Sequence, residues 1–247
     1  LEHYTTTDGS YKIPCYRWTW VHGAGHDDAH NFSGIFSLID AAESPDTELV
    51  SRMREKADLR QWMRTFAAND LGSYWDTFGN PGTKNAYLFE SLETQKWSVI
   101  VWDMDVGLGV FGDPFNAALF PANVDDNIKR LYDQPNVIRD YWQALDESLD
   151  GFFTATSDSA AHDILQETYD VLQANGANVI SPFVPSGPDG LAVDTWINMR
   201  RTFLQGELSG NNASFTALAD AISGSQFAPV SGTLPLATTS IAANGVP

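Results

Sequence analysis

The sequence is poor in cysteine, in basic residues and in long hydrophobic runs. Cys15 is the only cysteine among the 247 residues, which excludes an intrachain disulfide and a zinc site built from several thiolates. Fourteen Lys+Arg against 32 Asp+Glu give 14 − 32 = −18, so this acidic chain is not expected to bind nucleic acid or anionic lipid through a basic surface. The longest apolar run, around Val99–Trp102, is far shorter than the roughly 18 residues that span a bilayer.

The composition that is present predicts a folded chain in three parts. Hydrophobic residues make up 43% of the chain, which is enough for a sizeable core. Residues 1–34 have no periodicity and predict an irregular arm, and residues 35–224 predict one domain. From residue 225 on, Ser, Thr, Ala, Pro and β-branched residues predict a linker and the first strands of a β-sandwich-like module over 225–247. The two ends of the sequence indicate a piece of a longer protein with other domains.

Within residues 35–224 the periodicity is mainly helical. A short helix is expected from Ile35, and Ser44 and Pro45 predict the cap and the first turn of a second helix. A third helix, which ends near Gly72, is predicted by apolar residues spaced three and four apart: Leu59, Trp62, Met63, Phe66 and Ala67. Further helices are expected at 123–133, 136–152, 158–175, 190–207 and 212–223.

One region changes from a helical to an extended pattern. Residues 85–91 and 97–103 are apolar and β-prone, and they flank a polar turn at 92–96. This pattern predicts a β-hairpin. The predicted fold class is therefore α+β, helix-rich with a small sheet.

The sharpest chemical feature is the pair Asp103 and Asp105, which follows the second predicted strand and leads into Gly107 and Gly109. In an extended chain, side chains two residues apart point to the same face. Two carboxylates at a strand end suit a hard cation such as Mg²⁺ or Ca²⁺. A solvated strand end explains the same pattern, so the pair alone leaves both interpretations open.

A second acid, Asp76, follows the third predicted helix, and by itself it is typical of a turn. Its context is more specific. The chain runs from that helix through Trp-Asp to an Asn-x-Tyr-Leu strand that begins at Asn85, then through a Lys-Trp turn to Trp-Asp-x-Asp at a strand end. This order resembles the CotH kinase family, the atypical kinases similar to the spore coat protein CotH.

The resemblance implies a secreted or cell-surface protein kinase that uses Mg²⁺ and ATP to phosphorylate Ser or Thr of a protein substrate. It implies that Asp76 is the catalytic acid, which orients or deprotonates the hydroxyl. It places Asn85 and Asp103 at metal-binding positions, with Asp105 beside them, and Asn85 also near phosphate. It implies that Trp97 stacks on adenine. In the family most of the nucleotide-clamping lobe precedes this stretch, so we expect the chain to hold the C-terminal lobe portion.

Two other functions are compatible with the same residues. A non-catalytic secreted or surface module of the same fold would use the acidic pair to hold a structural Ca²⁺ ion. A glycoside hydrolase would use two of the acids as its catalytic pair and Trp97 as a sugar platform, which requires carboxyl groups about 5–9.5 Å apart across a cleft.

Overall fold

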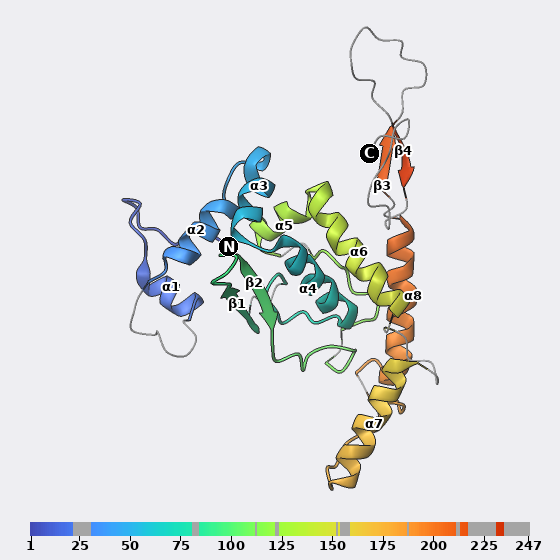
Figure 1. Ribbon diagram of the computed structural model, residues 1–247. Helices are drawn as coiled ribbons and strands as arrows, with labels where there is room; N and C mark the ends of the chain where they lie inside the picture. Colours follow the sequence, from blue (N-terminus) through green and yellow to red (C-terminus); the bar gives the residue numbers. More distant parts are fainter. Residues whose placement is uncertain are drawn as a thin grey trace. The chain divides into compact units, whose positions relative to one another are not determined.

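The computed structural model confirms the predicted class, an α+β fold in which helices predominate (Figure 1). By their mutual contacts the residues form two compact units. Unit 1 comprises Leu1–Phe66, Trp75–Met104 and Leu119–Ile138, and unit 2 comprises Ala67–Tyr74, Asp105–Ala118 and Arg139–Pro247. The structure describes residues 1–21, 31–80, 84–111, 113–121, 124–151, 153, 159–186 and 188–210, and the backbone of 213–216 and 231–234. None of the described helices has both the length and the hydropathy of a membrane span.

The N-terminal segment of unit 1 is more regular than predicted, because helix α1 (Ile13–Thr19) lies inside the arm expected to be irregular. Pro14 stands near its start, where a missing N–H costs nothing. Tyr16 is fully buried and packs edge-on against Phe36, with ring centroids 4.8 Å apart. Burial of this aromatic ring stabilises a helix that the local composition does not indicate. Residues 22–30 of the predicted arm lie outside the described residues.

The next two helices, α2 (Ser33–Ala42) and α3 (Asp46–Lys56), confirm the first two helices predicted after the arm, and they pack against each other. The expectation that Ser44 caps α3 is wrong. Pro45 occupies the N-cap position, and the hydroxyl of Ser44 donates instead to the carbonyl oxygen of Ala41, at 2.7 Å. The serine therefore hydrogen-bonds a carbonyl group at the end of α2 rather than an N–H group at the start of α3.

Helix α4 (Leu59–Gly72) confirms the third predicted helix and its buried face. Trp62 and Met63 are fully buried and Phe66 is nearly so, as their spacing predicts. The indole N–H of Trp62 donates to the carbonyl oxygen of Trp97 at 2.8 Å. The helix thus binds the backbone of the predicted hairpin as well as contributing to the core.

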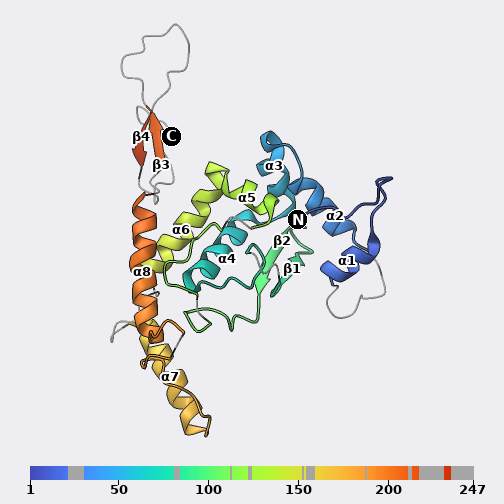
Figure 2. The ribbon, with the colours of Figure 1, turned by 180° about the vertical axis from the view of Figure 1, so that it is seen from behind.

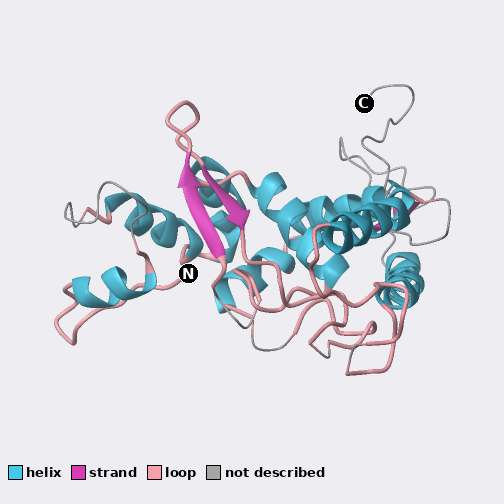
Figure 3. Cartoon of the chain, turned by 90° about the horizontal axis from the view of Figure 1, so that it is seen from below, coloured by secondary structure: helices cyan, strands magenta, loops and turns pink. Residues whose placement is uncertain are grey.

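The predicted hairpin forms from β1 (Ala86–Glu90) and β2 (Trp97–Val101), which pair antiparallel (Figure 3). The side-chain amide of Gln61, in α4, forms two hydrogen bonds with β2. Its Nε2 donates to the carbonyl oxygen of Val99 at 2.7 Å, and its Oε1 accepts from the backbone N–H of Val99 at 3.0 Å. A two-stranded sheet alone is marginal in water, so its attachment to α4 stabilises it.

The C-terminal half confirms four of the five further helices predicted (Figure 2). Their bounds are Asp126–Tyr132 (α5), Pro135–Gly151 (α6), Ala160–Ala174 (α7) and Val193–Gly210 (α8). The helix predicted at 212–223 is wrong where the structure describes it, because β3 (Ala213–Thr216) pairs antiparallel with β4 (Ser231–Leu234). Pairing between segments this far apart leaves no mark on the local pattern. Residues 235–247 lie outside the described residues, so the β-sandwich-like module stays a prediction.

Candidate functional site

The loop after α4 places Asp76 beside the residues that precede β1. The side-chain Nδ2 of Asn85 donates to Oδ2 of Asp76 at 3.2 Å, and Nζ of Lys84 lies 3.0 Å from the same oxygen. The Asp76 side chain is 11% exposed, whereas that of Lys84 is 66% exposed. The structure thus brings together two residues that the sequence assigned to one site. It adds Lys84, whose only sequence signal is its place directly before Asn85.

Asn85 and Asp103 stand where the two paired strands of the hairpin meet their flanking loops. The backbone N–H of Trp102 donates to the carbonyl oxygen of Asn85 at 3.0 Å. Asn85 has φ 56° and Asp103 has φ 55°, in the left-handed region that Asn and Asp tolerate better than most residues. Such backbone conformations are concentrated at functional sites. Hydrogen bonds join Asp76 to Asn85 and Asn85 to Trp102, and Asp103 is the next residue.

The two acids after β2 do not lie on a continuous strand. β2 ends at Val101, and the chain turns at Asp103. The expectation that Asp103 and Asp105 point to one face holds only for an extended chain, and the backbone at Asp103 is not extended. Both residues are exposed, and Asp105 belongs to unit 2. Of the predicted catalytic and metal-binding residues, Asp76, Asn85 and Asp103 thus lie in unit 1.

Trp97 lies at the other end of the hairpin, where it pairs with Glu90. Its indole packs against α2 so closely that a Cβ on Gly34 would come within 2.9 Å of Cζ2. Its Nε1 is buried and has no hydrogen-bond partner among the described residues. Asp76 contacts Asn85, the residue before β1, whereas Trp97 pairs with Glu90, the last residue of β1. The length of β1, about 13 Å for four steps of 3.3 Å, therefore separates Trp97 from the end of the hairpin that Asp76 contacts.

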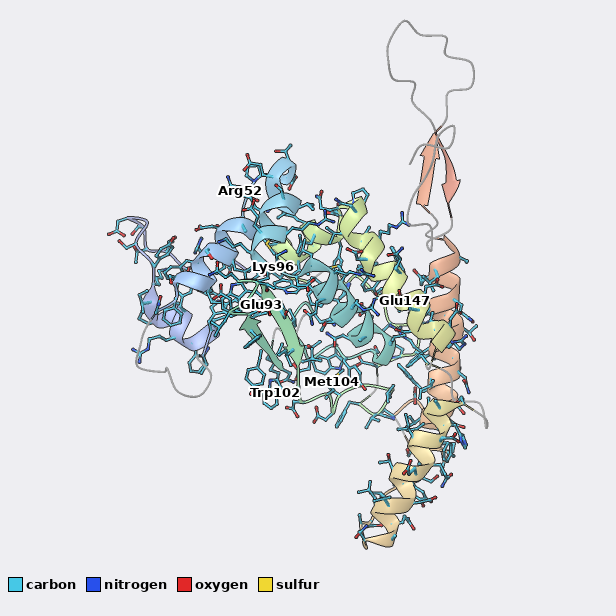
Figure 4. The ribbon with its side chains drawn as sticks, in the orientation of Figure 1. Arg52, Glu93, Lys96, Trp102, Met104 and Glu147 are labelled. Atoms are coloured by element: carbon cyan, nitrogen blue, oxygen red, sulfur yellow. The ribbon has the colours of Figure 1, made fainter. Side chains whose placement is uncertain are left out.

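One face of the hairpin is apolar and exposed, which the sequence analysis did not anticipate. The rings of Tyr87 and Trp102 stack with centroids 5.8 Å apart, and the two residues are 55% and 48% exposed. Phe89 and Ile100 are 55% and 50% exposed. Figure 4 shows Trp102 and Met104 at the end of the hairpin away from its turn. The alternation of these side chains along both strands is the signal that could have revealed the face.

A buried acid lies in unit 2. Asp70 is 7% exposed, and the hydroxyl of Tyr141 donates to its Oδ2 at 2.7 Å. Burial raises the pKa of Asp70 to about 7, against the opposing effects of the Tyr141 hydrogen bond and the positive charge of Arg200. The carboxyl group is buried, so it does not offer a surface for a ligand.

The chemistry of the donors in unit 1 fits a hard cation. Asp76, Asn85 and Asp103 offer carboxylate and amide oxygens, and Mg²⁺ is commonly bound by one or two carboxylates together with water and substrate phosphates. Within the described part of the chain, no three side chains of His, Cys, Asp or Glu form a metal-binding cluster. The type of donor atoms, and not a formed cluster, is what makes the residues at the end of the hairpin compatible with Mg²⁺ on a phosphate-bearing substrate.

The fold is helix-rich α+β, with an acid and an amide joined by a hydrogen bond beside a small hairpin. Comparison with known protein families identifies the family. The sequence profile of the CotH kinase protein family matches residues 21–172, which is more than half of the chain, so the chain belongs to the CotH kinase family. No curated protein matches the chain. The matched residues include the hairpin and all the predicted site residues, whereas α8 lies beyond them.

Proposed function

We propose that the protein transfers the γ-phosphoryl group of ATP to Ser or Thr hydroxyls of secreted or cell-surface proteins. The observation that carries this proposal is the hydrogen bond from Asn85 to Asp76, with Lys84 on the same carboxylate. Phosphoryl transfer requires mainly positioning and neutralisation of charge, and a carboxylate, an amide and a cation in one place can supply both. Membership of the CotH kinase family supports the same reaction.

In the proposed reaction Asp76 orients the substrate hydroxyl and accepts its proton. The hydroxyl oxygen forms a bond to the γ-phosphorus as the bond from that phosphorus to the bridging oxygen of ADP breaks, and the proton passes to a carboxylate oxygen of Asp76. The hydrogen bond from Asn85 fixes the orientation of this carboxylate. A positioned base of this kind typically accelerates a reaction by about 10²–10⁴-fold.

Asn85, Asp103 and Asp105 are the proposed ligands of Mg²⁺, which when bound neutralises charge on the phosphates. Asp103 is the stronger candidate of the two acids, because it directly follows Trp102, whose backbone is bonded to Asn85. We expect the carboxylates of Asp76 and Asp103 to lie within about 10 Å of each other, since both must reach one ion or its water shell.

Lys84 provides a cation that the sequence analysis did not assign. Its ammonium group is largely exposed although it pairs with Asp76, so a phosphate can reach it. Solvent at this exposed ammonium group weakens the ion pair, so a more highly charged phosphate can compete with the carboxylate for it. We propose that Lys84 contacts the γ-phosphate. Trp97, which lies within the residues matched by the family profile, is the proposed adenine platform.

Transfer of labelled phosphate from ATP to casein by the intact protein tests the role of Asp76. We expect Asp76→Asn to lower kcat by about 100-fold or more, because the amide cannot accept the hydroxyl proton. Asp46→Asn is the matched control: Asp46 also forms an ion pair, with Arg130 at 2.7 Å, but stands in the first turn of α3. Equal activity of Asp76→Asn and Asp46→Asn would remove Asp76 from the reaction.

Calorimetric titration with ATP and Mg²⁺ tests the ligands. We expect Asp103→Asn to weaken the binding of ATP with Mg²⁺ by about tenfold or more, and Asp105→Asn to weaken it less. We expect Lys84→Met to weaken the binding of ATP more than the binding of ADP. Unchanged affinity in both Asp103→Asn and Trp97→Ala would exclude a nucleotide site on this hairpin. If Ca²⁺ then raised the melting temperature of the wild type but not of Asp103→Asn, the protein would be a non-catalytic surface module.

A further inference from the structure

The segment that begins with the proposed metal ligand Asp105, residues 105–118 of unit 2, contains no helix or strand among its described residues, yet its backbone is held in place. The backbone N–H of Leu108 donates to the carbonyl oxygen of Gly72, at the end of α4, at 2.8 Å. The N–H of Val110 donates to the carbonyl oxygen of Gly107 at 3.0 Å. The segment therefore begins with a fixed turn.

Arg200 of α8 holds the later part of this segment. Its Nη1 donates to the carbonyl oxygens of Phe115 at 3.0 Å and Ala117 at 2.8 Å, while Nε and Nη2 donate to the carbonyl oxygen of Asp70 at 3.1 and 2.6 Å. Arg200 is 1% exposed, and this desolvation lowers the pKa of its guanidinium group, whereas the nearby Asp70 carboxylate raises it. Arginine stays charged in proteins, so these carbonyl oxygens compensate a buried charge.

Trp196, one turn earlier in α8, contacts the same segment at two further points. Its Nε1 donates to the carbonyl oxygen of Asp113 at 3.0 Å. Its indole lies so close to Gly109 that a Cβ there would come within 2.4 Å of Cδ1, and Gly109 has φ +79°. The segment is thus attached to α8 through backbone atoms and a glycine, none of which depends on the chemistry of the segment's own side chains.

We propose that Arg200, supported by Trp196, is a positioning residue for phosphoryl transfer, because it fixes the segment that begins at Asp105. Through this segment it sets the position of Asp105. The catalytic part of this inference rests on the proposed function. Metal ligands need support from groups behind them, and loss of that support typically costs about 10–100-fold in affinity or activity. The working kinase domain then includes α8, beyond the residues matched by the family profile.

Arg201 provides a matched control on the same helix. It is also partly buried, and its Nη1 donates to the carbonyl oxygens of Leu149 and Phe153, the latter at 3.1 Å. These carbonyl groups belong to the end of α6 and the residues just after it. Arg201 therefore shares the residue type, the helix and the kind of bond with Arg200, but it does not contact residues 105–118 through them.

Hydrogen exchange and cation binding test the proposal. We expect Arg200→Gln to speed exchange at the amides of Leu108 and Val110 by about tenfold or more, whereas Arg201→Gln leaves it near the wild-type rate. We expect Arg200→Gln to weaken Mn²⁺ binding, followed by electron paramagnetic resonance, by about tenfold, and to raise the Mg²⁺ concentration for half-maximal activity in proportion. A purely structural role would reduce the amount of folded protein without moving this Mg²⁺ concentration.

Three outcomes overturn the inference: unchanged exchange in folded Arg200→Gln, unchanged Mn²⁺ affinity in that variant, or equal effects of Arg201→Gln. If Arg200→Gln does not fold, Arg200→Lys decides, since lysine keeps the charge but cannot reach three carbonyl oxygens with one planar fork. Wild-type exchange and Mn²⁺ affinity in Arg200→Lys would also overturn it. If the wild type neither binds Mn²⁺ nor transfers phosphate while Arg200→Gln still loosens the segment, the proposed function fails and the anchoring stands.

Discussion

The buried carboxyl group of Asp70 makes the stability of the protein dependent on pH in a predictable direction. Burial raises the pKa of Asp70 in the folded state from 3.8 to about 7, so the folded protein binds this proton more tightly than the unfolded chain does. The stabilising contribution is therefore complete below pH 3.8 and is lost as the pH rises through 7. Asp70→Asn removes the titration while its amide oxygen can still accept from Tyr141.

The size of the effect follows from the two pKa values of Asp70. Between them, one extra proton on the folded state changes the free energy of unfolding by about 1.4 kcal/mol per pH unit. Integration from about pH 5.5 to about pH 8 gives a loss of about 2 kcal/mol, because the slope fades once the folded state also releases its proton. Other groups titrate too, so the prediction concerns the difference between wild type and Asp70→Asn.

Urea unfolding at several pH values across this range measures that difference. We expect the free energy of unfolding of the wild type to fall by about 2 kcal/mol more than that of Asp70→Asn. Tyr141→Phe should move the loss to higher pH, because the Tyr141 hydrogen bond lowers the pKa of Asp70. Parallel curves for wild type and Asp70→Asn would refute the assignment of a raised pKa to this buried group.

Two further substitutions test backbone conformation through the free energy of unfolding. Gly109→Ala should cost about 2–4 kcal/mol, since it adds overpacking against Trp196 to a left-handed backbone, whereas Gly176→Ala, with φ +78° and open space around it, should cost only about 1 kcal/mol. Equal costs would mean that the ring of Trp196 moves aside. Gln95→Gly should stabilise the hairpin by about 0.5–1 kcal/mol, because Gln95 has φ 54° in the turn, and a loss of stability would contradict this account of strain.

Elements whose signal is local could be predicted from the sequence. The spacing of Trp62, Met63 and Phe66 identifies the buried face of α4, and the polar turn between two apolar runs identifies the hairpin. Burial and pairing at a distance could not be predicted in this way. Tyr16 stabilises a helix in a segment of irregular composition, and β3 replaces a predicted helix by pairing with β4, a separate segment of the chain.

The same division holds for the candidate site. The order of motifs assigns Asp76 and Asn85 to one site, and a hydrogen bond joins the two side chains in the structure. The alternation rule fails at Asp103, since it assumes an extended backbone and the residue has φ 55°. Arg200 is 130 residues away from Asp70, whose carbonyl oxygen it binds, and no local pattern records a contact at that separation.

The two hydrogen bonds of the Gln61 side-chain amide leave only one edge of the hairpin open to a further strand. A side chain occupies the backbone N–H and carbonyl group of Val99 that a third strand would need, so that border of β2 is already closed. Among the described residues β1 pairs with β2 alone. Any strand that enlarges this sheet, whether from the same polypeptide or from a substrate in extended conformation, must therefore add alongside β1, the strand that directly follows Lys84 and Asn85.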